Sequence, residues 1–530
     1  MEITSYESPS TLCSQCNHQF QHTIYDPNPV NTALRSNYSP ELLESKLIVE
    51  TMSTIDNHLA RYTSEAARVR AMLEALLTRR EELIRFKACC SSVLAPIRKL
   101  PPEILQAIFL ACLDHKPNVI PITGQICQHW RKITISTPEL WSNISVGRTR
   151  FMAHEKYQDL AALFLERSSN LPLSISLRQP VSDALISTLV EHTQRWRKLN
   201  LISTKYTFYL SIALSTLVFP LLETLEIGEE ITPVAGIPVK PIPLPVGHVP
   251  RLRRVILKDK MAHWELPWSQ ITDIQYDTAV APDGLLLLQK CPNLKYCAME
   301  QLRFAGSFDS TESSAIPLRH LESLRLGINY SSNTVVRNPQ TVTRSFFQRL
   351  VVPQLKSLQL IGQWSPEDFT DFLSRNELNQ QLTHLSLGTG YMKDDNIIQI
   401  LEALPLVQNL VLDADIGTTR QLQNRVITDK LLRRFILYPD SDCVLPALEH
   451  LTLRTSLNFD EGILLDIITS RWQGWATELY GIAVTRIASI TFDFCGRRET
   501  LEQDTIQDLR DFRKDGLLIT LRQGNEQIKL

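Results

Sequence analysis

The sequence predicts an α+β multidomain protein, in which a long helix and three short helices precede an irregular α/β solenoid. Three observations carry this prediction: a heptad spacing of apolar residues before residue 97, three short amphipathic runs between residues 98 and 147, and a leucine motif that recurs from residue 150 to the end. At 530 residues the chain exceeds the size at which one hydrophobic core stops growing, so several units are expected.

The composition predicts an ordinary soluble protein, with 43% hydrophobic and 21% charged residues. A net charge of −2 argues against a nucleic-acid partner, because such domains are usually strongly basic. Ten cysteines are too few for a disulfide scaffold, which favours a reducing compartment, the cytoplasm and/or the nucleus. The most apolar stretch, residues 208–222, is too short for a bilayer, so no membrane association is expected.

Residues 1–40 are rich in Ser, Asn, Pro, Gln and Thr, and this composition predicts a disordered tail. Within it, Cys13, Cys16, His18 and His22 resemble part of a zinc ligand set. No second Cys-x-x-Cys pair follows, and no apolar pattern nearby would orient the ligands. We therefore expect neither a metal nor another cofactor, with a reduced, exposed tail as the simpler interpretation.

Residues 41–97 predict a long amphipathic helix. Its apolar positions alternate in steps of four and three, which is a heptad seam. They are Ile55, Leu59, Tyr62, Ala66, Val69, Leu73 and Leu76, with a break at Arg80 and a return at Leu83. Two interpretations follow: self-association of residues 55–83 as a coiled coil, or one amphipathic helix that lies on the domains after it.

Residues 98–147 predict three short helices. Pro102 and Glu103 suit the first turn of the first helix. Thr137 and Pro138 suit the start of the third. The apolar positions fall at helical spacing. They are Ile104, Leu105, Ile108, Phe109 and Cys112 in the first run, Ile122, Ile126, Trp130 and Ile133 in the second, and Leu140, Trp141 and Ile144 in the third.

This segment resembles an F-box of the long fungal type, from Leu100-Pro101-Pro102-Glu103 to the closing Ser136-Thr137-Pro138-Glu139-Leu140-Trp141. The resemblance covers about a tenth of the chain. It implies an adaptor that docks on the Skp-type subunit of a cullin ubiquitin ligase, while the remaining chain selects the substrate. The adaptor-facing residues implied by the motif are Leu100, Pro101, Ile104, Leu105, Ile108 and Trp130. The alternative is a helical hairpin inside a larger domain.

The motif L-x-x-L-x-L recurs through residues 150–530, and its alternating end predicts a short strand with one buried face. Its second leucine position falls at Leu199, Leu225, Val255, Cys297, Leu324, Leu358, Leu385, Leu410 and Leu451. Amphipathic runs such as residues 366–373 separate the copies, as in a leucine-rich repeat. The copies are roughly 25 to 42 residues apart, whereas about 20–29 is usual. An ordinary α/β domain is the competing architecture.

No P-loop, dinucleotide fingerprint, nucleophile elbow or HExxH helix is present in the sequence, so we expect no enzyme. The best-supported function is a substrate-recognition adaptor of an SCF-type (Skp–cullin–F-box) ligase, with an unknown protein substrate. A repeat-based scaffold or receptor outside any ligase is the alternative, and an enzyme with a site in the insertions is a weaker third interpretation.

Overall fold

The computed structural model describes most of the chain. The described residues are 4–13, 18–36, 38–115, 119–146, 154–177, 182–201, 216–228, 242–258, 264–303, 314–329, 339–362, 364–389, 392–414, 427–438, 444–457, 459–472, 478–479, 482–494, 501–523 and 526–528. The chain divides into two compact units, Met1–Ile104 and Leu105–Leu530, and the boundary falls within helix α3 (Pro102–His115).

The first unit contains a hairpin, a short helix and the long helix that the sequence predicts. Its elements are β1 (Ser5–Cys13), β2 (His18–Tyr25), α1 (Asn28–Arg35), α2 (Leu42–Val93) and the 3-10 helix η1 (Pro96–Lys99). A capping box starts α2: the Glu41 side chain accepts from the N3 backbone, and the Glu44 carboxylate accepts from the Glu41 amide. Pro96 follows the end of α2, because proline cannot continue a helix.

The disordered tail expected for residues 1–40 is not what the structure shows, because most of this stretch is regular. Strands β1 and β2 pair antiparallel from Ser5↔Tyr25 to Cys13↔His18. Aromatic side chains explain the difference: the His22 ring stacks on the Tyr62 ring of α2 at 5.6 Å, and Tyr25 meets His58 edge-on at 6.3 Å. The hairpin thus uses α2 as its hydrophobic support, a long-range contact that local composition does not reveal.

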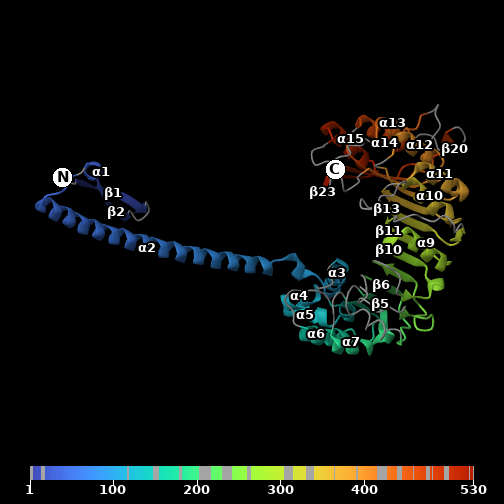
Figure 1. Ribbon diagram of the computed structural model, residues 1–530, viewed down its shortest axis with the longest axis horizontal. Coiled ribbons are helices and arrows are strands. Elements are labelled where there is room, and N and C mark those ends of the chain that lie inside the picture. The colour runs from blue at the N-terminus through green and yellow to red at the C-terminus, as the bar shows by residue number, and fades with distance from the viewer. Residues whose placement is uncertain are drawn as a thin grey trace. The chain divides into compact units, whose positions relative to one another are not determined.

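The second unit begins with helices and continues as strands alternating with helices (Figure 1). After α3 come α4 (Val119–Ile126), α5 (Gln128–Ile135), the 3-10 helix η2 (Pro138–Trp141), β3 (Asn143–Val146), α6 (His154–Arg167), β4 (Leu173–Leu177), α7 (Asp183–Val190), η3 (Thr193–Arg195), β5 (Trp196–Leu201), β6 (Thr224–Ile227), β7 (Ile242–Pro243), β8 (Arg254–Leu257), β9 (Trp264–Glu265), η4 (Trp268–Gln270), β10 (Asp273–Val280) and α9 (Ala281–Lys290). The order then runs β11 (Tyr296–Arg303), β12 (Ile316–Pro317), β13 (Ser323–Asn329), α10 (Pro339–Arg349), β14 (Leu350–Val351), β15 (Ser357–Gly362), α11 (Pro366–Arg375), η5 (Leu378–Gln380), β16 (His384–Gly388), α12 (Asp394–Glu402), β17 (Asn409–Asp413), α13 (Asp429–Arg433), β18 (His450–Thr455), α14 (Gly462–Trp472), β19 (Glu478–Leu479), β20 (Ile482–Ala483), β21 (Ser489–Phe494), α15 (Gln503–Lys514), β22 (Leu518–Gln523) and β23 (Glu526–Ile528).

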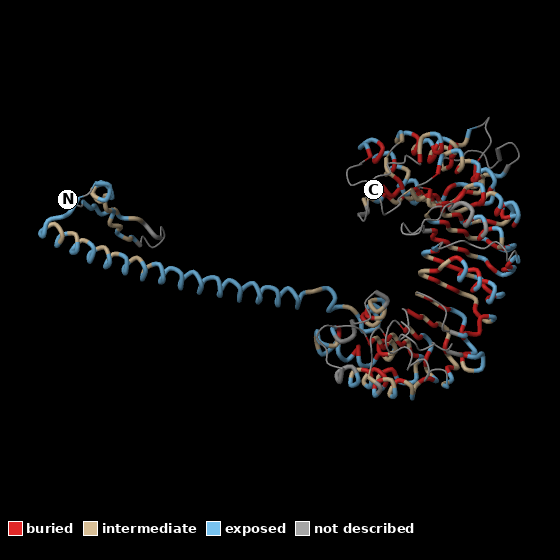
Figure 2. The backbone as a smooth tube through the Cα atoms, viewed as in Figure 1, coloured by how far each residue is buried: buried red, intermediate tan, exposed pale blue. Residues whose placement is uncertain are grey.

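One 15-stranded sheet organises this unit, in the order β3-β4-β5-β6-β8-β10-β11-β13-β15-β16-β17-β18-β21-β22-β23. All neighbouring strands are parallel except β22 and β23. The leucines of the motif align across strands, as in Leu358↔Leu385↔Leu410, and these residues are buried. Buried residues recur along the strands of the array (Figure 2). The predicted mixed helix and sheet architecture, with a long N-terminal helix and a large parallel sheet, is confirmed.

Strand β10 explains part of the uneven spacing of the motif. It pairs with both β8 and β11, although the sequence motif skips it. The buried residues Ile271, just before the strand, and Ile274 and Tyr276 within it occupy the three leucine positions, so the sequence motif misses this strand. The 42-residue interval between Val255 and Cys297 therefore contains one further strand.

Two details of the predicted short helices differ. Cys127 interrupts the second run, since its extended backbone makes it the N-cap of α5, with its Sγ accepting from the Trp130 amide at 3.5 Å. The third run is the 3-10 helix η2, and Ile144 lies on β3, the edge strand of the large sheet. The four residues of η2 are too few for a stable α-helix. The chain continues as β3, which pairs with β4.

Replacing Gly362 with alanine is expected to destabilise the second unit by about 2 kcal/mol or more, since positive-φ strain alone costs about 1–3 kcal/mol. Gly362 has φ +89°, and an added Cβ would lie 2.0 Å from the Ile328 carbonyl oxygen. Gly247→Ala is the control, because no heavy atom lies within 4 Å of the added Cβ there. Denaturant unfolding measures both variants, and equal midpoints for the two would contradict the argument.

Candidate functional site

Helices α3, α4 and α5 have a packed interior. Leu105, Phe109 and Ile133 are buried, and the Phe109 and Trp130 rings lie 4.9 Å apart. The Trp141 indole N–H donates to the Thr134 carbonyl at 2.7 Å, which ties η2 to the end of α5. This segment therefore has its own hydrophobic interior, as helical spacing in the sequence predicts.

Each of the three helices also keeps aliphatic surface in contact with solvent. The exposed fraction is 37% at Ile108 on α3, 61% at Ile122 and 55% at Ile126 on α4, and Ile135 on α5 is exposed too. Burying a fully exposed branched aliphatic side chain would contribute about 1.5–3 kcal/mol of favourable free energy. These exposed isoleucines are therefore candidates for contact with a partner.

The six residues implied by the F-box resemblance divide between exposed and interior positions. Leu100, Pro101 and Ile104 belong to the first unit, whereas Leu105, Ile108 and Trp130 belong to the second. Pro101, Ile104 and Ile108 are exposed, and Leu100 and Trp130 are half-buried. Leu105 is only 1% exposed, so its side chain supports helix packing and offers no contact surface.

Ile122, Ile126 and Ile135 are exposed positions that sequence analysis did not single out for partner binding. Helical spacing places Ile122 and Ile126 on an apolar face, but spacing alone does not say whether that face meets the interior or solvent. The structure supplies this distinction.

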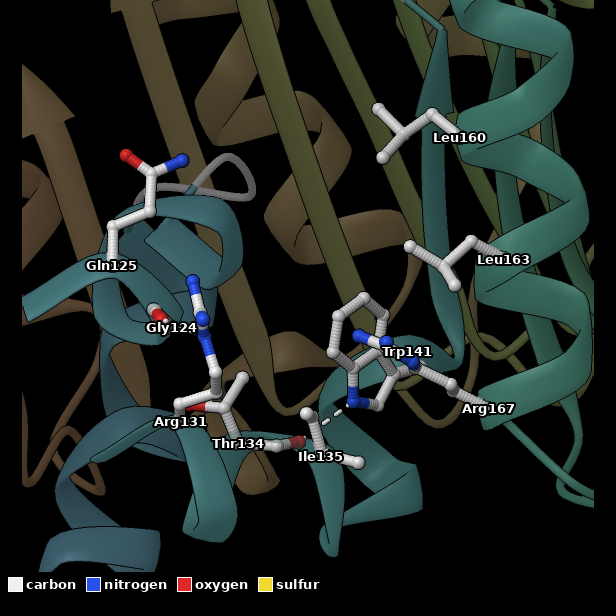
Figure 3. Close-up of a pocket in the computed structure, with 9 residues that line it drawn as sticks. All are labelled: Gly124, Gln125, Arg131, Thr134, Ile135, Trp141, Leu160, Leu163 and Arg167. Carbon is white, nitrogen blue, oxygen red and sulfur yellow. Dashed lines mark hydrogen bonds between the residues drawn. The ribbon is translucent and has the colours of Figure 1, made fainter. Parts of the chain in front are cut away.

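A pocket with a volume of ≈ 380 Å³ lies where α4 and α5 approach α6 (Figure 3). The residues that line it are Gly124, Gln125, Arg131, Thr134, Ile135, Trp141, Leu160, Leu163 and Arg167. Four of the nine lining residues are aliphatic or aromatic, and two arginines from different helices supply the charge.

The two arginines of the pocket are oriented by different contacts. Arg131 donates from Nε to the Gly124 carbonyl at 2.9 Å, while the Arg167 guanidinium lies 4.5 Å from the centroid of the Trp141 ring. Trp141 packs in turn on Phe164 of α6 at 4.9 Å. Neither arginine forms an ion pair with a carboxylate in the part of the chain that the structure describes.

Charged side chains on the polar face of the large sheet form ion pairs between neighbouring strands. The Lys258 ammonium lies 2.7 Å from Asp277 and 3.4 Å from Glu226. Burial would lower the pKa of Lys258, but its hydrogen bond to Asp277 and the two carboxylate charges outweigh that effect and raise it. Arg454 bridges Asp413 and Asp493 in the same way. These groups neutralise one another, so they resemble structural pairs more than a reactive centre.

The structure describes only part of the histidine and cysteine set that the sequence singled out as a possible zinc site. Cys16 and the side chains of Cys13 and His18 lie outside the described residues, and the His22 ring stacks on Tyr62. His384 bonds to Thr383 and Asn409, which are ordinary surface contacts. Among the residues with described placement, no group of three or more His, Cys, Asp or Glu could hold a metal ion.

No described helix is long and apolar enough to cross a membrane.

The second half of α2 has a surface of its own. The hairpin leaves Ile55, His58 and Tyr62 half-buried, whereas every residue of the helix from Ala66 to Val93 is exposed (Figure 2). Val69, Leu73, Leu76 and Leu83 continue the heptad seam there. The hairpin thus covers the seam at Tyr62, while Leu59 remains 57% exposed.

Self-association through α2 is therefore expected to use residues 66–90 and to be weak, because Arg80 and Lys87 interrupt the seam. Cys90 continues the seam seven residues after Leu83, and Cys89 points away from it. In a parallel pair, mild oxidation should cross-link the chain through Cys90, so Cys90→Ser should abolish the dimer band on non-reducing gels and Cys89→Ser should retain it. A monomer by light scattering with no cross-link would refute parallel pairing.

Comparison with known proteins leaves the family of the chain open. No protein-family model matches the sequence, and no curated protein is similar to it.

Proposed function

We propose that the chain is the substrate-recognition adaptor of an SCF-type ubiquitin ligase, in which residues 98–147 dock the Skp-type subunit and, through it, a cullin. The observation that carries the proposal is the exposed aliphatic set Ile108, Ile122, Ile126 and Ile135 on a segment with its own packed interior. The F-box-like sequence from Leu100 to Trp141 supports the same interpretation.

The region after residue 150 would act as a leucine-rich-repeat-like solenoid that binds a protein substrate. Aligned buried leucines such as Leu358 and Leu385 support stacked repeats, because each strand–helix unit buries its apolar face only against its neighbours. The opposite face of each strand presents half-buried polar residues such as Gln359 and Ser386, which suit recognition by hydrogen bonds. Ubiquitin transfer would belong to other subunits, so this chain would need neither a catalytic group nor a cofactor.

A repeat-based scaffold or receptor outside any ligase remains the alternative, and one observation favours it. Strand β3 follows η2 directly and forms the edge of the large sheet, while Trp141 packs on Phe164 of α6. The short helical segment is thus joined through η2 to the edge of the strand array, which would suit a capping role that needs no partner.

Affinity purification of the tagged full-length chain from its native cells separates the two functions. Under the ligase proposal, mass spectrometry of the intact complex should find a Skp-type subunit in a one-to-one ratio, together with a cullin. A complex that lacks both, recovered under the same low-salt conditions, would favour the scaffold.

A further inference from the structure

We infer that the pocket lined by Arg131 and Arg167 binds an acidic peptide segment, in which an aliphatic side chain enters the pocket and flanking carboxylates pair with the two arginines. The inference concerns the chain by itself and does not depend on adaptor docking. It rests on the shape of the cavity, on its apolar walls and on the charge at its sides.

The walls of the pocket suit an aliphatic side chain. Leu160 and Leu163, one turn apart on α6, are half-buried and point into the pocket, as Figure 3 shows. Ile135 is exposed on the facing helix, and the buried Trp141 ring lies between the two helices. A volume of ≈ 380 Å³ is within the range of about 300–1,000 Å³ that ligand pockets occupy. Burying an aliphatic group here would remove apolar surface of both partners from water.

The charges of the pocket suit carboxylates. The Gly124 carbonyl accepts from Nε of Arg131, and the indole ring of Trp141 covers one face of Arg167. Stacking and helix packing orient the two guanidinium groups before any ligand arrives, which lowers the entropic cost of binding. Elsewhere in this unit, partly exposed arginines such as Arg325 and Arg454 meet carboxylates of neighbouring strands. At the pocket, a carboxylate from another molecule would complete equivalent ion pairs.

The surrounding charges favour a peptide over a polyanion such as nucleic acid. Exposed acidic residues lie on elements that line the pocket, namely Glu139 on η2 and Asp159 and Glu166 on α6. A long phosphate backbone would meet these carboxylates, whereas a short segment with two or three carboxylates would engage only the pocket. The net charge of −2 for the whole chain agrees with this choice.

The test uses two fluorescein-labelled ten-residue peptides and the purified full-length chain. In the first, two leucines four positions apart are flanked by Asp and Glu; in the second, Asn and Gln replace every acid. Fluorescence anisotropy should show the acidic peptide binding at least about tenfold more tightly than the neutral one, since a charge-assisted pair contributes on the order of 1.4 kcal/mol or more.

Variants locate the binding site. Arg131→Glu and Arg167→Glu should each weaken binding of the acidic peptide by about tenfold or more. Lys132→Glu is the matched control, because it makes the same change of charge on α5. Lys132 is exposed and does not line the pocket. It should leave the affinity within about twofold, apart from weak long-range screening effects. Ile135→Asn should weaken binding through the apolar wall without any change of charge.

Three results would overturn the inference. Equal binding of the acidic and neutral peptides would remove the role of charge, and an equal loss in Lys132→Glu would show non-specific attraction. A third peptide carries phosphoserine in place of the acids; if it alone binds, the pocket recognises phosphate and not carboxylate. If Arg167→Glu fails to fold, as circular dichroism would show, Arg131→Glu still decides the outcome because its side chain is exposed.

Discussion

Replacing Ile104 and Ile108 together with aspartate is expected to abolish capture of a Skp-type subunit. The two residues lie one helical turn apart on α3, with exposed fractions of 49% and 37%. A buried anchor in an interface contributes about 2 kcal/mol or more, so losing two should weaken binding by about a thousandfold. Pull-down of the separately purified Skp-type subunit measures the change.

The matched control is Ile361→Asp on strand β15. Ile361 is 38% exposed, which is close to Ile108, and it lies on the large sheet, outside the helical segment. This variant should bind the Skp-type subunit as well as the unmodified chain does. Undiminished capture by the double variant, with a normal melting curve, would exclude α3 from the interface and support the scaffold.

The sequence predicts the large-scale architecture because its signals are local and repeated. A strand such as β16 carries the last two leucines of the motif, Leu385 and Leu387, so alternation alone identifies its buried face. Helix α2 is similarly evident, since its heptad seam runs between Glu41 and Pro96 without a glycine or a proline to break the helix. These features need no information from distant parts of the chain.

Features that depend on distant contacts were less predictable. Strands β1 and β2 gain their support from Tyr62 and His58, more than thirty residues away in sequence. Strand β10 replaces leucine with isoleucine and tyrosine, and only its pairing with β8 and β11 identifies it as part of the array.

The candidate site shows the same limit. Helical spacing places Ile104, Leu105 and Ile108 together as an apolar run, but only tertiary structure separates buried Leu105 from its exposed neighbours. The pocket was not predicted at all, because Arg131 and Arg167 come from helices that are adjacent only in the fold. An arginine at the end of an amphipathic helix has no sequence signal that distinguishes ligand binding from ordinary solvation.

Arg471 on α14 connects three segments of the second unit, although no pattern in the sequence marks it. It is 3% exposed, and its guanidinium donates to the carbonyls of Phe435, Val444 and Leu445 at 2.7, 2.7 and 3.1 Å. Leu445 has a left-handed backbone with φ 53°, which costs about 1–2 kcal/mol for a residue with a Cβ. The fork of Arg471 thus holds a strained turn just before β18.

Replacing Arg471 with methionine is expected to destabilise the second unit by about 3 to 5 kcal/mol, because three buried carbonyls lose their charged donor. The stability of Arg471→Lys should lie between that of Arg471→Met and that of the unmodified chain. One ammonium group cannot reproduce a planar guanidinium with several donors. Arg433→Met on α13 is the control: its side chain is exposed, so the change should stay within about 0.5 kcal/mol. Denaturant unfolding followed by circular dichroism measures all three, and hydrogen exchange should show the largest loss of protection around residues 435–455. If Arg471→Met unfolds at the midpoint of Arg433→Met, the three carbonyl contacts contribute no net stability and the turn at Leu445 is held by packing alone.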